Sequence, residues 1–114
     1  MTLVYKIVPR PLWRAAEADG VFKGAPVDLA DGFIHFSTAS QTRETAEKHF
    51  AGQGDLLLVA VEAEAFGAAM KWEISRGGAL FPHLYAPLPV AAARRVDAIP
   101  QTAGGKHDFA GLLT

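Results

Sequence analysis

Runs and alternations of apolar residues along the chain predict a series of short strands. The segments are Leu3–Val8, Phe33–Phe36, Leu56–Glu62, Met70–Ile74, Leu80–Tyr85 and Arg95–Ile99. Leu56–Glu62 is apolar on both faces, which is typical of a strand near the centre of a sheet. In the fourth segment apolar and polar residues alternate, so Met70, Trp72 and Ile74 are predicted to share a buried face. The Gly77-Gly78 pair predicts a turn that folds the fifth segment back beside the fourth.

Two other segments have the spacing of amphipathic helices. The first starts at Pro11 and stops at Asp19-Gly20. The second follows Thr38, where Gln41 completes a capping box, and runs to about Phe50. Its predicted inward stripe consists of Ala39, Thr42, Ala46, His49 and Phe50.

The remaining segments lack a regular pattern. Val21–Leu29 is interrupted by Gly24 and Pro26 and is predicted to be loop with at most a short strand. The glycine-rich tail after Pro100 is predicted to be loosely held. Strands that cluster after helices favour an α+β fold with a bent, mainly antiparallel sheet and two or three short helices. At 114 residues the chain is predicted to be a single domain, residues 1–114.

Composition narrows the functional classes. A net charge of −1 without a basic patch argues against nucleic-acid and membrane binding. The absence of cysteine excludes disulfides, thiol catalysis and cysteine-bound zinc, and it fits a reducing cytosol. The N-terminus lacks a signal-peptide pattern, and no apolar run approaches the roughly 20 residues that span a bilayer. We therefore expect a soluble, cytoplasmic protein, and the sequence leaves its oligomeric state open.

Candidate chemistry is concentrated in two motifs, Asp31–Thr38 (DGFIHFST) and Phe81–Tyr85 (FPHLY). Successive side chains of a strand point to opposite faces. His35 therefore shares a face with Ser37, and His83 shares one with the tyrosine two positions later. If the two strands are neighbours, both imidazoles line one pocket. The turn at Gly77-Gly78 would bring Trp72 and Glu73 to the border of the same pocket.

Each of these residues also has a plain structural explanation. A strand histidine such as His35 is often a core residue that a backbone carbonyl satisfies. His83 and Tyr85 can be packed aromatic side chains with hydrogen-bonded polar tips. Taken alone, Trp72 is more typical of a core and Glu73 of a solvated strand.

The end of the first motif offers a second kind of site. The strand ends at Ser37 and a helix follows Thr38, so free backbone N–H groups and two hydroxyls there can bind an anion such as a phosphate. A metal site made of His35, His49 and His83 is a further alternative. Their spacings match no local ligand motif, and no metal is expected.

The two motifs belong to a longer set of segments. These are Tyr5–Ile7, Trp13, Asp28, Asp31–Ala39, Gln41, Thr45-Ala46, Trp72-Glu73, Phe81–Tyr85 and Pro87-Leu88. In these segments the chain resembles the bacterial and plant family catalogued as domain of unknown function 952 (DUF952). It departs from the family's pattern at Ala25, where serine is usual, and at Ala86, where glycine is usual. That family is similar in fold to the ADP-ribosyltransferases, so the resemblance implies an ADP-ribosyltransferase-like fold with a nucleotide cleft between two small bent sheets.

The resemblance also implies roles for individual residues. In ADP-ribosyltransferases a strand-borne histidine or arginine grips the NAD ribose, and a Ser/Thr segment supports the cleft. An aromatic side chain stacks on nicotinamide, and a carboxylate activates the acceptor. On this basis we assign catalysis to Glu73, and cofactor binding to His35, Ser37, Thr38, Trp72 and Tyr85. We also assign catalysis to His83, because its strand position places it in the same predicted pocket.

The leading hypothesis is a small-molecule site for NAD or a related nucleotide. NAD would be the substrate of ADP-ribosyl transfer or of nicotinamide–ribose cleavage. The competing hypothesis is a non-catalytic module that binds a small metabolite or a peptide, because the sequence contains no unambiguous acid–base pair. A histidine-based metal hydrolase is the third alternative.

Overall fold

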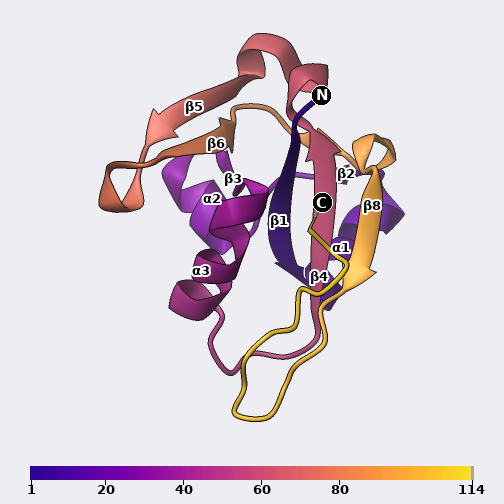
Figure 1. Cartoon of the computed structure of the whole chain (residues 1–114). Coiled ribbons are helices and arrows are strands. Elements are labelled where there is room, and N and C mark those ends of the chain that lie inside the picture. The colour runs from indigo at the N-terminus through magenta and orange to yellow at the C-terminus, as the bar shows by residue number, and fades with distance from the viewer. Residues whose placement is uncertain (114) are drawn as a thin grey trace.

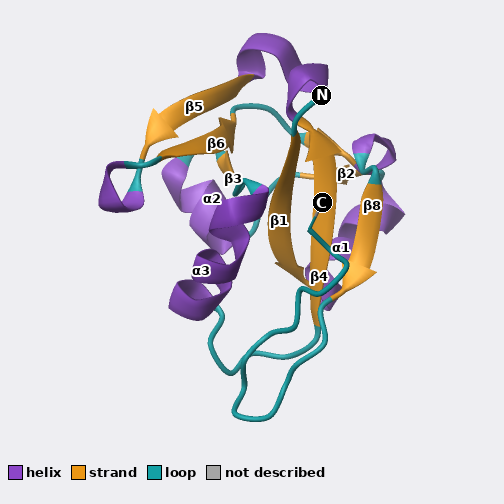
Figure 2. Ribbon diagram, in the orientation of Figure 1, coloured by secondary structure: helices purple, strands orange, loops and turns teal. Residues whose placement is uncertain are grey.

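The computed structural model describes residues 1–113 and contains three small sheets connected by short helices (Figures 1 and 2). Its strands are β1 (Leu3–Pro9), β2 (Val21–Phe22), β3 (Ile34–His35), β4 (Leu56–Glu62), β5 (Met70–Ile74), β6 (Leu80–Leu84), β7 (Leu88–Pro89) and β8 (Arg95–Ala98). Its helices are α1 (Arg10–Asp19), α2 (Pro26–Asp31) and α3 (Ala39–His49), with the 3-10 segments η1 (Ala63–Ala69), η2 (Arg76–Gly78) and η3 (Val90–Ala92). The described strands pair antiparallel, which confirms the predicted α+β class.

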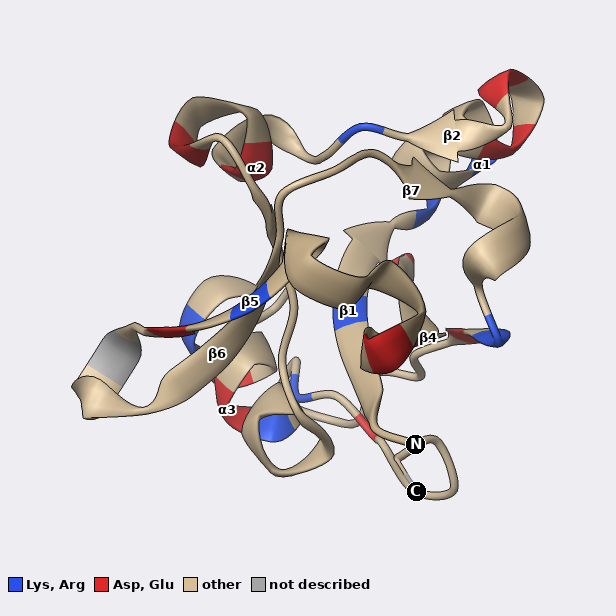
Figure 3. Ribbon diagram, turned by 90° about the horizontal axis from the view of Figure 1, so that it is seen from above, with Lys and Arg blue, Asp and Glu red and all other residues tan. Residues whose placement is uncertain are grey.

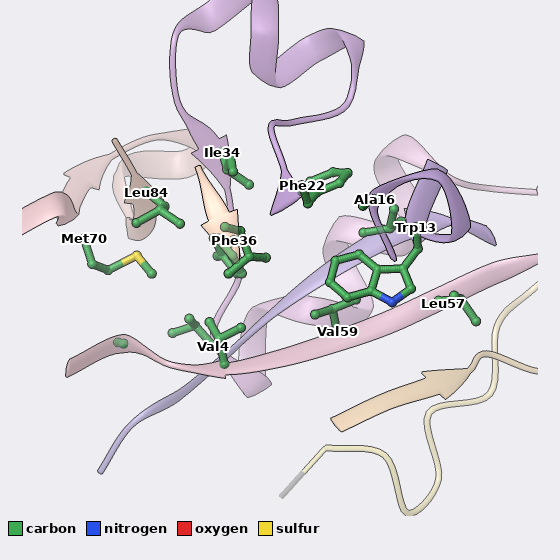
Figure 4. Packing of buried hydrophobic residues seen from close by; sticks show 14 residues of the cluster. Val4, Trp13, Ala16, Phe22, Ile34, Phe36, Leu57, Val59, Met70 and Leu84 are labelled. Atoms are coloured by element: carbon green, nitrogen blue, oxygen red, sulfur yellow. The ribbon is translucent and has the colours of Figure 1, made fainter. Parts of the chain in front are cut away.

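The largest sheet has the strand order β1-β4-β8, with β4 at its centre as predicted. Residues of β4 alternate between two separate cores, so Leu57 packs into one and Leu58 into the other. The first core lies between this sheet, α1 and the two smaller sheets, and Figure 4 shows Trp13 of α1 packed over Val59. The second core is covered by α3 and the C-terminal tail.

The smaller sheets complete the first core. One has the order β3-β6-β5, and the other pairs β2 with β7. β6 is the middle strand although it contains Pro82, which has no N–H to donate. Proline is accepted there because β3 uses only the carbonyl of Pro82, which takes a hydrogen bond from the Phe36 N–H at 3.0 Å.

The prediction that Val21–Leu29 is mainly loop was wrong, because α2 begins at Pro26. Proline lacks an N–H, and a helix needs none at its first position. The Asp28 carboxylate accepts the Ala25 N–H at 2.7 Å and so caps the helix from its third position. Gly32, with φ at 85°, ends the helix in the left-handed conformation that favours glycine.

Two predictions of burial were also wrong. Trp72 and Ile74 are 42% and 74% exposed, because β5 is an edge strand and this face of its hairpin has no covering layer beyond Met70. The tail is held more firmly than predicted, because Phe109 is buried in the second core. No helix among residues 1–113 is both long and apolar enough to cross a membrane.

We predict that β4 is equally important on its two faces. Leu57→Ala and Leu58→Ala should each lower the free energy of unfolding by about 2–5 kcal/mol, because each leaves a cavity in a separate core. Urea denaturation measures both losses. Leu29→Ala, at a side chain that is 65% exposed, should change stability by less than about 0.5 kcal/mol. A loss below that level at either core leucine would contradict the two-core arrangement.

Candidate functional site

The two histidines of the motifs are direct neighbours across β3 and β6. His35 is the register partner of His83, and the centroids of their rings are 5.4 Å apart. Phe33 stacks on His83 at 4.2 Å and contacts His35 at 4.5 Å and Tyr85 at 5.1 Å. The prediction that both imidazoles line one pocket is confirmed, since both belong to the wall of the same cavity.

Two carboxylates bracket His35. Its Nδ1 lies 2.6 Å from Asp28 Oδ1, and its Nε2 lies 2.9 Å from Asp31 Oδ2. A neutral imidazole carries one N–H and donates to one acceptor, whereas the protonated ring donates to both. With both carboxylates ionised, this clamp is fully hydrogen-bonded when His35 is an imidazolium. Both ring nitrogens are then occupied by the protein.

Asp28 is the centre of a buried polar network. It forms an ion pair with Lys6, whose Nζ lies 3.1 Å from Oδ2 and also donates to the His35 carbonyl at 3.1 Å. Lys6 is 6% exposed and Asp28 is 2% exposed. The Asp28 carboxylate also accepts the backbone N–H of His35 at 3.1 Å, in addition to the one at Ala25. Gly24 runs so close to Asp28 that a Cβ there would lie 2.8 Å from the Asp28 Cβ.

Burial alone raises the pKa of Asp28, but its partners outweigh burial. The hydrogen bond from the His35 ring, the charge of Lys6 and the two backbone N–H groups lower this pKa from 3.8 to about 2. Burial lowers the pKa of Lys6, and Asp28 opposes that shift. The carboxylate is therefore held in its ionised form by groups from β1, α2 and β3.

Glu73 orients the second imidazole. Its Oε1 lies 2.8 Å from His83 Nδ1 and accepts the Tyr85 hydroxyl at 2.7 Å. Hydrogen bonds from Tyr85 and His83 lower the pKa of Glu73, and the bond to Glu73 raises the pKa of Tyr85. An ionised Glu73 accepts the Nδ1 proton of His83, which leaves Nε2 of this ring as a hydrogen-bond acceptor.

The cavity beside the two imidazoles has a volume of about 560 Å³. It runs along β1 between α2 and α3. Its polar lining residues are Tyr5, Lys6, Asp31, His35, Ser37, Thr45, His49, Gln53, Ser75 and His83. Its apolar lining residues are Ile7, Pro9, Leu12, Ala25, Pro26, Val27, Phe36, Phe50 and Phe81. This size and this mixed lining are typical of small-molecule sites, which enclose roughly 300–1,000 Å³.

Ser37 is part of this wall, and its hydroxyl is already committed. The Thr45 hydroxyl donates to the Gln41 carbonyl at 3.1 Å, so in the 2.8 Å contact between Ser37 Oγ and Thr45 Oγ1 the serine is the donor. Ser37 therefore offers the cavity only acceptor lone pairs.

The structure does not bring every predicted site residue to the cavity. Thr38 caps α3, its N–H donates to Gln41 Oε1 at 3.0 Å, and it does not line this cavity. The anion site that we expected at the start of α3, around Thr38, therefore lies outside the cavity.

Trp72 lies opposite Pro82, on the face of β5 that points away from Glu73, so it does not border the pocket as predicted. Alternation along β5 separates Trp72 from Glu73. Glu73 bonds to His83 and to Tyr85, but neither Glu73 nor Tyr85 lines the cavity, so the prediction that Glu73 borders it was wrong as well.

Sequence reasoning missed the buried partners of His35. Lys6 was the available signal, because it is the one charged residue in an apolar strand and shares a face with Val4 and Val8. A lysine at such a position needs a buried counter-ion. Figure 3 shows the acidic segments on α2, where that counter-ion lies. Within residues 1–113 no group of three His, Asp or Glu side chains is arranged to hold a metal ion.

Comparison with known proteins identifies a family but indicates no activity or ligand. A family model described as "Protein of unknown function (DUF952)" matches residues 7–96. The crystal structure of protein CC0527 from Caulobacter crescentus is similar, with 53% identity, a TM-score of 0.92 and 96% of each chain covered. A solution NMR structure of that protein has 53% identity and a TM-score of 0.89, covering 100% of this chain and 98% of the other. The search of curated proteins found no match.

We predict that Asp28→Asn is strongly destabilising. The substitution leaves Lys6 buried without a counter-charge, and breaking one partner of a buried pair costs about 3–5 kcal/mol. Chemical denaturation measures the loss. Asp31→Asn is the control, because Asp31 is 47% exposed and should contribute less than about 1 kcal/mol. Equal losses at the two positions would contradict the role of Asp28 as the buried centre.

The same carboxylate should make stability depend on pH. Its pKa in the folded state, about 2, lies below the ordinary value of 3.8. Its contribution is therefore fully present above about pH 4 and is lost as the pH falls through about 2. The shift corresponds to about 2 kcal/mol. Denaturation curves between pH 6 and pH 2 should show this loss in the wild type and not in Asp28→Asn. Parallel pH profiles would contradict it.

Proposed function

The chain belongs to the DUF952 family of proteins of unknown function, and from the geometry of its site we propose that it binds NAD or a related nucleotide and cleaves the bond between nicotinamide and ribose. The ADP-ribosyl group would pass to an acceptor or to water. The observation that carries this proposal is His83, oriented by Glu73 at the wall of a cavity of about 560 Å³.

The free hydrogen-bonding capacity at this end of the cavity suits the reaction. His83 Nε2 and Ser37 Oγ offer lone pairs, while both nitrogens of His35 face carboxylates of the protein. Cleavage of a glycosidic bond builds positive charge on the ribose, as in an oxocarbenium ion. Carboxylates close to the reacting carbon stabilise such charge, and Asp31, which lines the cavity and contacts His35, would act in this way, whereas Glu73 would act through its bond to His83.

The proposed reaction requires one proton transfer. Nicotinamide leaves as a neutral molecule when the bond between its ring nitrogen and the ribose carbon breaks. The hydroxyl of water or of an acceptor then attacks that carbon, and His83 Nε2 removes its proton. Glu73 stabilises the imidazolium that results, through the bond to Nδ1. In this scheme Tyr85 positions Glu73, His35 with Asp31 borders the ribose, and Trp72 has no contact with the ligand.

We include in the proposal a fold of the ADP-ribosyltransferase type. What supports it is the arrangement of two three-stranded antiparallel sheets, β1-β4-β8 and β3-β6-β5, with the cavity beside β1 and the β3–β6 pair. Figure 1 displays the two sheets at an angle to each other, with α2 and α3 on the cavity side of β1.

A second candidate function is binding without turnover. The observation that favours it is the clamp on His35, which occupies both ring nitrogens and removes this imidazole from proton transfer. A single available imidazole is sufficient to hold a metabolite or a peptide group by hydrogen bonding. Turnover separates this function from the first.

We expect NAD and ADP-ribose, titrated to millimolar concentration, to shift the NMR signals of His35, Glu73 and Tyr85. Nicotinamide release, followed by chromatography, should fall about 100-fold or more in Glu73→Gln, because glutamine keeps an acceptor for His83 but not the charge. Glu47→Gln, an exposed position on α3, is the matched control and should leave the rate unchanged.

Three results separate the alternatives. Unshifted signals at all three residues would overturn nucleotide binding. Shifts without nicotinamide release would leave the binding module as the better account. An unchanged rate in Glu73→Gln would remove this carboxylate from the reaction.

A further inference from the structure

The outer edge of β5 has no strand beside it within residues 1–113, because β5 ends the sheet β3-β6-β5. The backbone bonds that flank the β5–β6 ladder run from Tyr85 N–H to the Ala69 carbonyl and from Ser75 N–H to the Ala79 carbonyl. In an antiparallel pair, alternate residues bond to the same neighbour. Met70, Trp72 and Ile74 therefore direct their N–H and C=O groups away from β6, toward the open edge.

The edge is also apolar on one face. Trp72 of β5, Ile74 of β5 and Leu80 of β6 are 42%, 74% and 52% exposed and lie on one face of the hairpin. An unpaired strand edge that is flanked by exposed apolar side chains favours pairing with a strand of another chain. Proteins keep such an edge free with a proline, a bulge or charged side chains. β5 has a regular register from Met70 to Ile74 and no proline, and its two charges, Lys71 and Glu73, are of opposite sign, so they can attract a second copy.

The sequence of β5 is self-complementary. It reads Met-Lys-Trp-Glu-Ile, with an apolar residue at the centre and at both ends and one charge of each sign between them. A two-fold axis at Trp72 that pairs two such strands antiparallel places Lys71 opposite Glu73 of the second copy, and Glu73 opposite its Lys71. Figure 3 shows basic and acidic segments following each other along β5.

We propose that a second copy of this chain pairs with β5 across this axis, joining two three-stranded sheets into one of six strands. The backbone pattern fits. Trp72, whose polar backbone groups face outward, meets its counterpart in a hydrogen-bonded pair. Lys71 and Glu73 then form pairs without backbone bonds, in which side chains approach more closely. On the other face, Trp72 packs against Trp72 of the second copy, and Ile74 lies opposite Met70 of the second copy.

The pairing reaches the candidate site through Glu73. Among the residues that the structure describes, both hydrogen bonds to Glu73, from His83 and Tyr85, fall on Oε1, and Oε2 accepts none. Lys71 of the second copy is placed beside this carboxylate. Each copy thereby contributes a charge to the site of the other, next to the group that orients His83.

Sedimentation velocity tests the proposal over about 10 µM to 1 mM, because an interface limited to one strand edge is at the small end of specific interfaces. The wild type should sediment increasingly as a dimer. Lys71→Glu sets two like-charged pairs across the axis and should weaken dimerisation roughly tenfold or more. The double variant Lys71→Glu/Glu73→Lys restores opposite charges and should return the dissociation constant to within about threefold of the wild type. Lys48→Glu, on α3, changes the net charge equally and should have no effect.

Two further measurements remain valid if the Glu73 variant folds poorly. Trp72→Pro removes an outward N–H and should abolish the dimer, while the amide signals of Lys71 and Glu73, which bond to β6, persist. Mixed isotope-labelled and unlabelled wild-type protein should show intermolecular contacts between the Lys71 and Glu73 α-protons. A monomer at every concentration would overturn the proposal and leave the edge to an extended segment of another protein. A dimer indifferent to Lys71→Glu and Trp72→Pro would also overturn it.

Discussion

The buried ion pair between Lys6 and Asp28 is the constraint on which the rest of the site depends. Removing two charges from water costs several kcal/mol for each ion, and only good geometry with further hydrogen bonds offsets that cost. Here the partners come from β1, α2 and β3, so the three elements fit together in one arrangement. Any shift of α2 against the main sheet would leave a charge or a backbone N–H unpaired.

This constraint explains how a strand of two residues can position a histidine. β3 is too short to define its own register by ladder bonds. Instead, Asp28 accepts both the backbone N–H and the ring Nδ1 of His35, while Lys6 donates to the His35 carbonyl. The backbone and the ring are thus fixed by the same buried charges. The register with β6, and therefore the contact between His35 and His83, follows from them.

Much of the fold could be predicted from the sequence, because its signals are local. The apolar run Leu56–Glu62 indicated a central strand, and the Thr38 and Gln41 pair indicated the start of α3. Alternation in β5 revealed two faces but not which one has a covering layer, so Trp72 was misplaced. In the sequence, Pro26 is compatible with a helix breaker and with the first residue of a helix. The tertiary contacts of α2 decide between the two. The neighbouring positions of His35 and His83 followed from strand alternation, whereas the clamp by Asp28 and Asp31 depends on tertiary packing.

Asp28 and Glu73, which each hold the Nδ1 atom of one imidazole, act in different ways because they differ in burial. Asp28 is enclosed and balanced by Lys6, so His35 is held rigidly and both of its nitrogens are occupied. The Glu73 side chain is 38% exposed and lies on an edge strand, where solvent or a neighbouring cation can reach it. A charge near Glu73 changes how strongly this carboxylate binds the N–H of His83 Nδ1. In the proposed function, His35 is therefore the fixed imidazole that shapes the cavity, and His83 is the imidazole that would take part in the reaction.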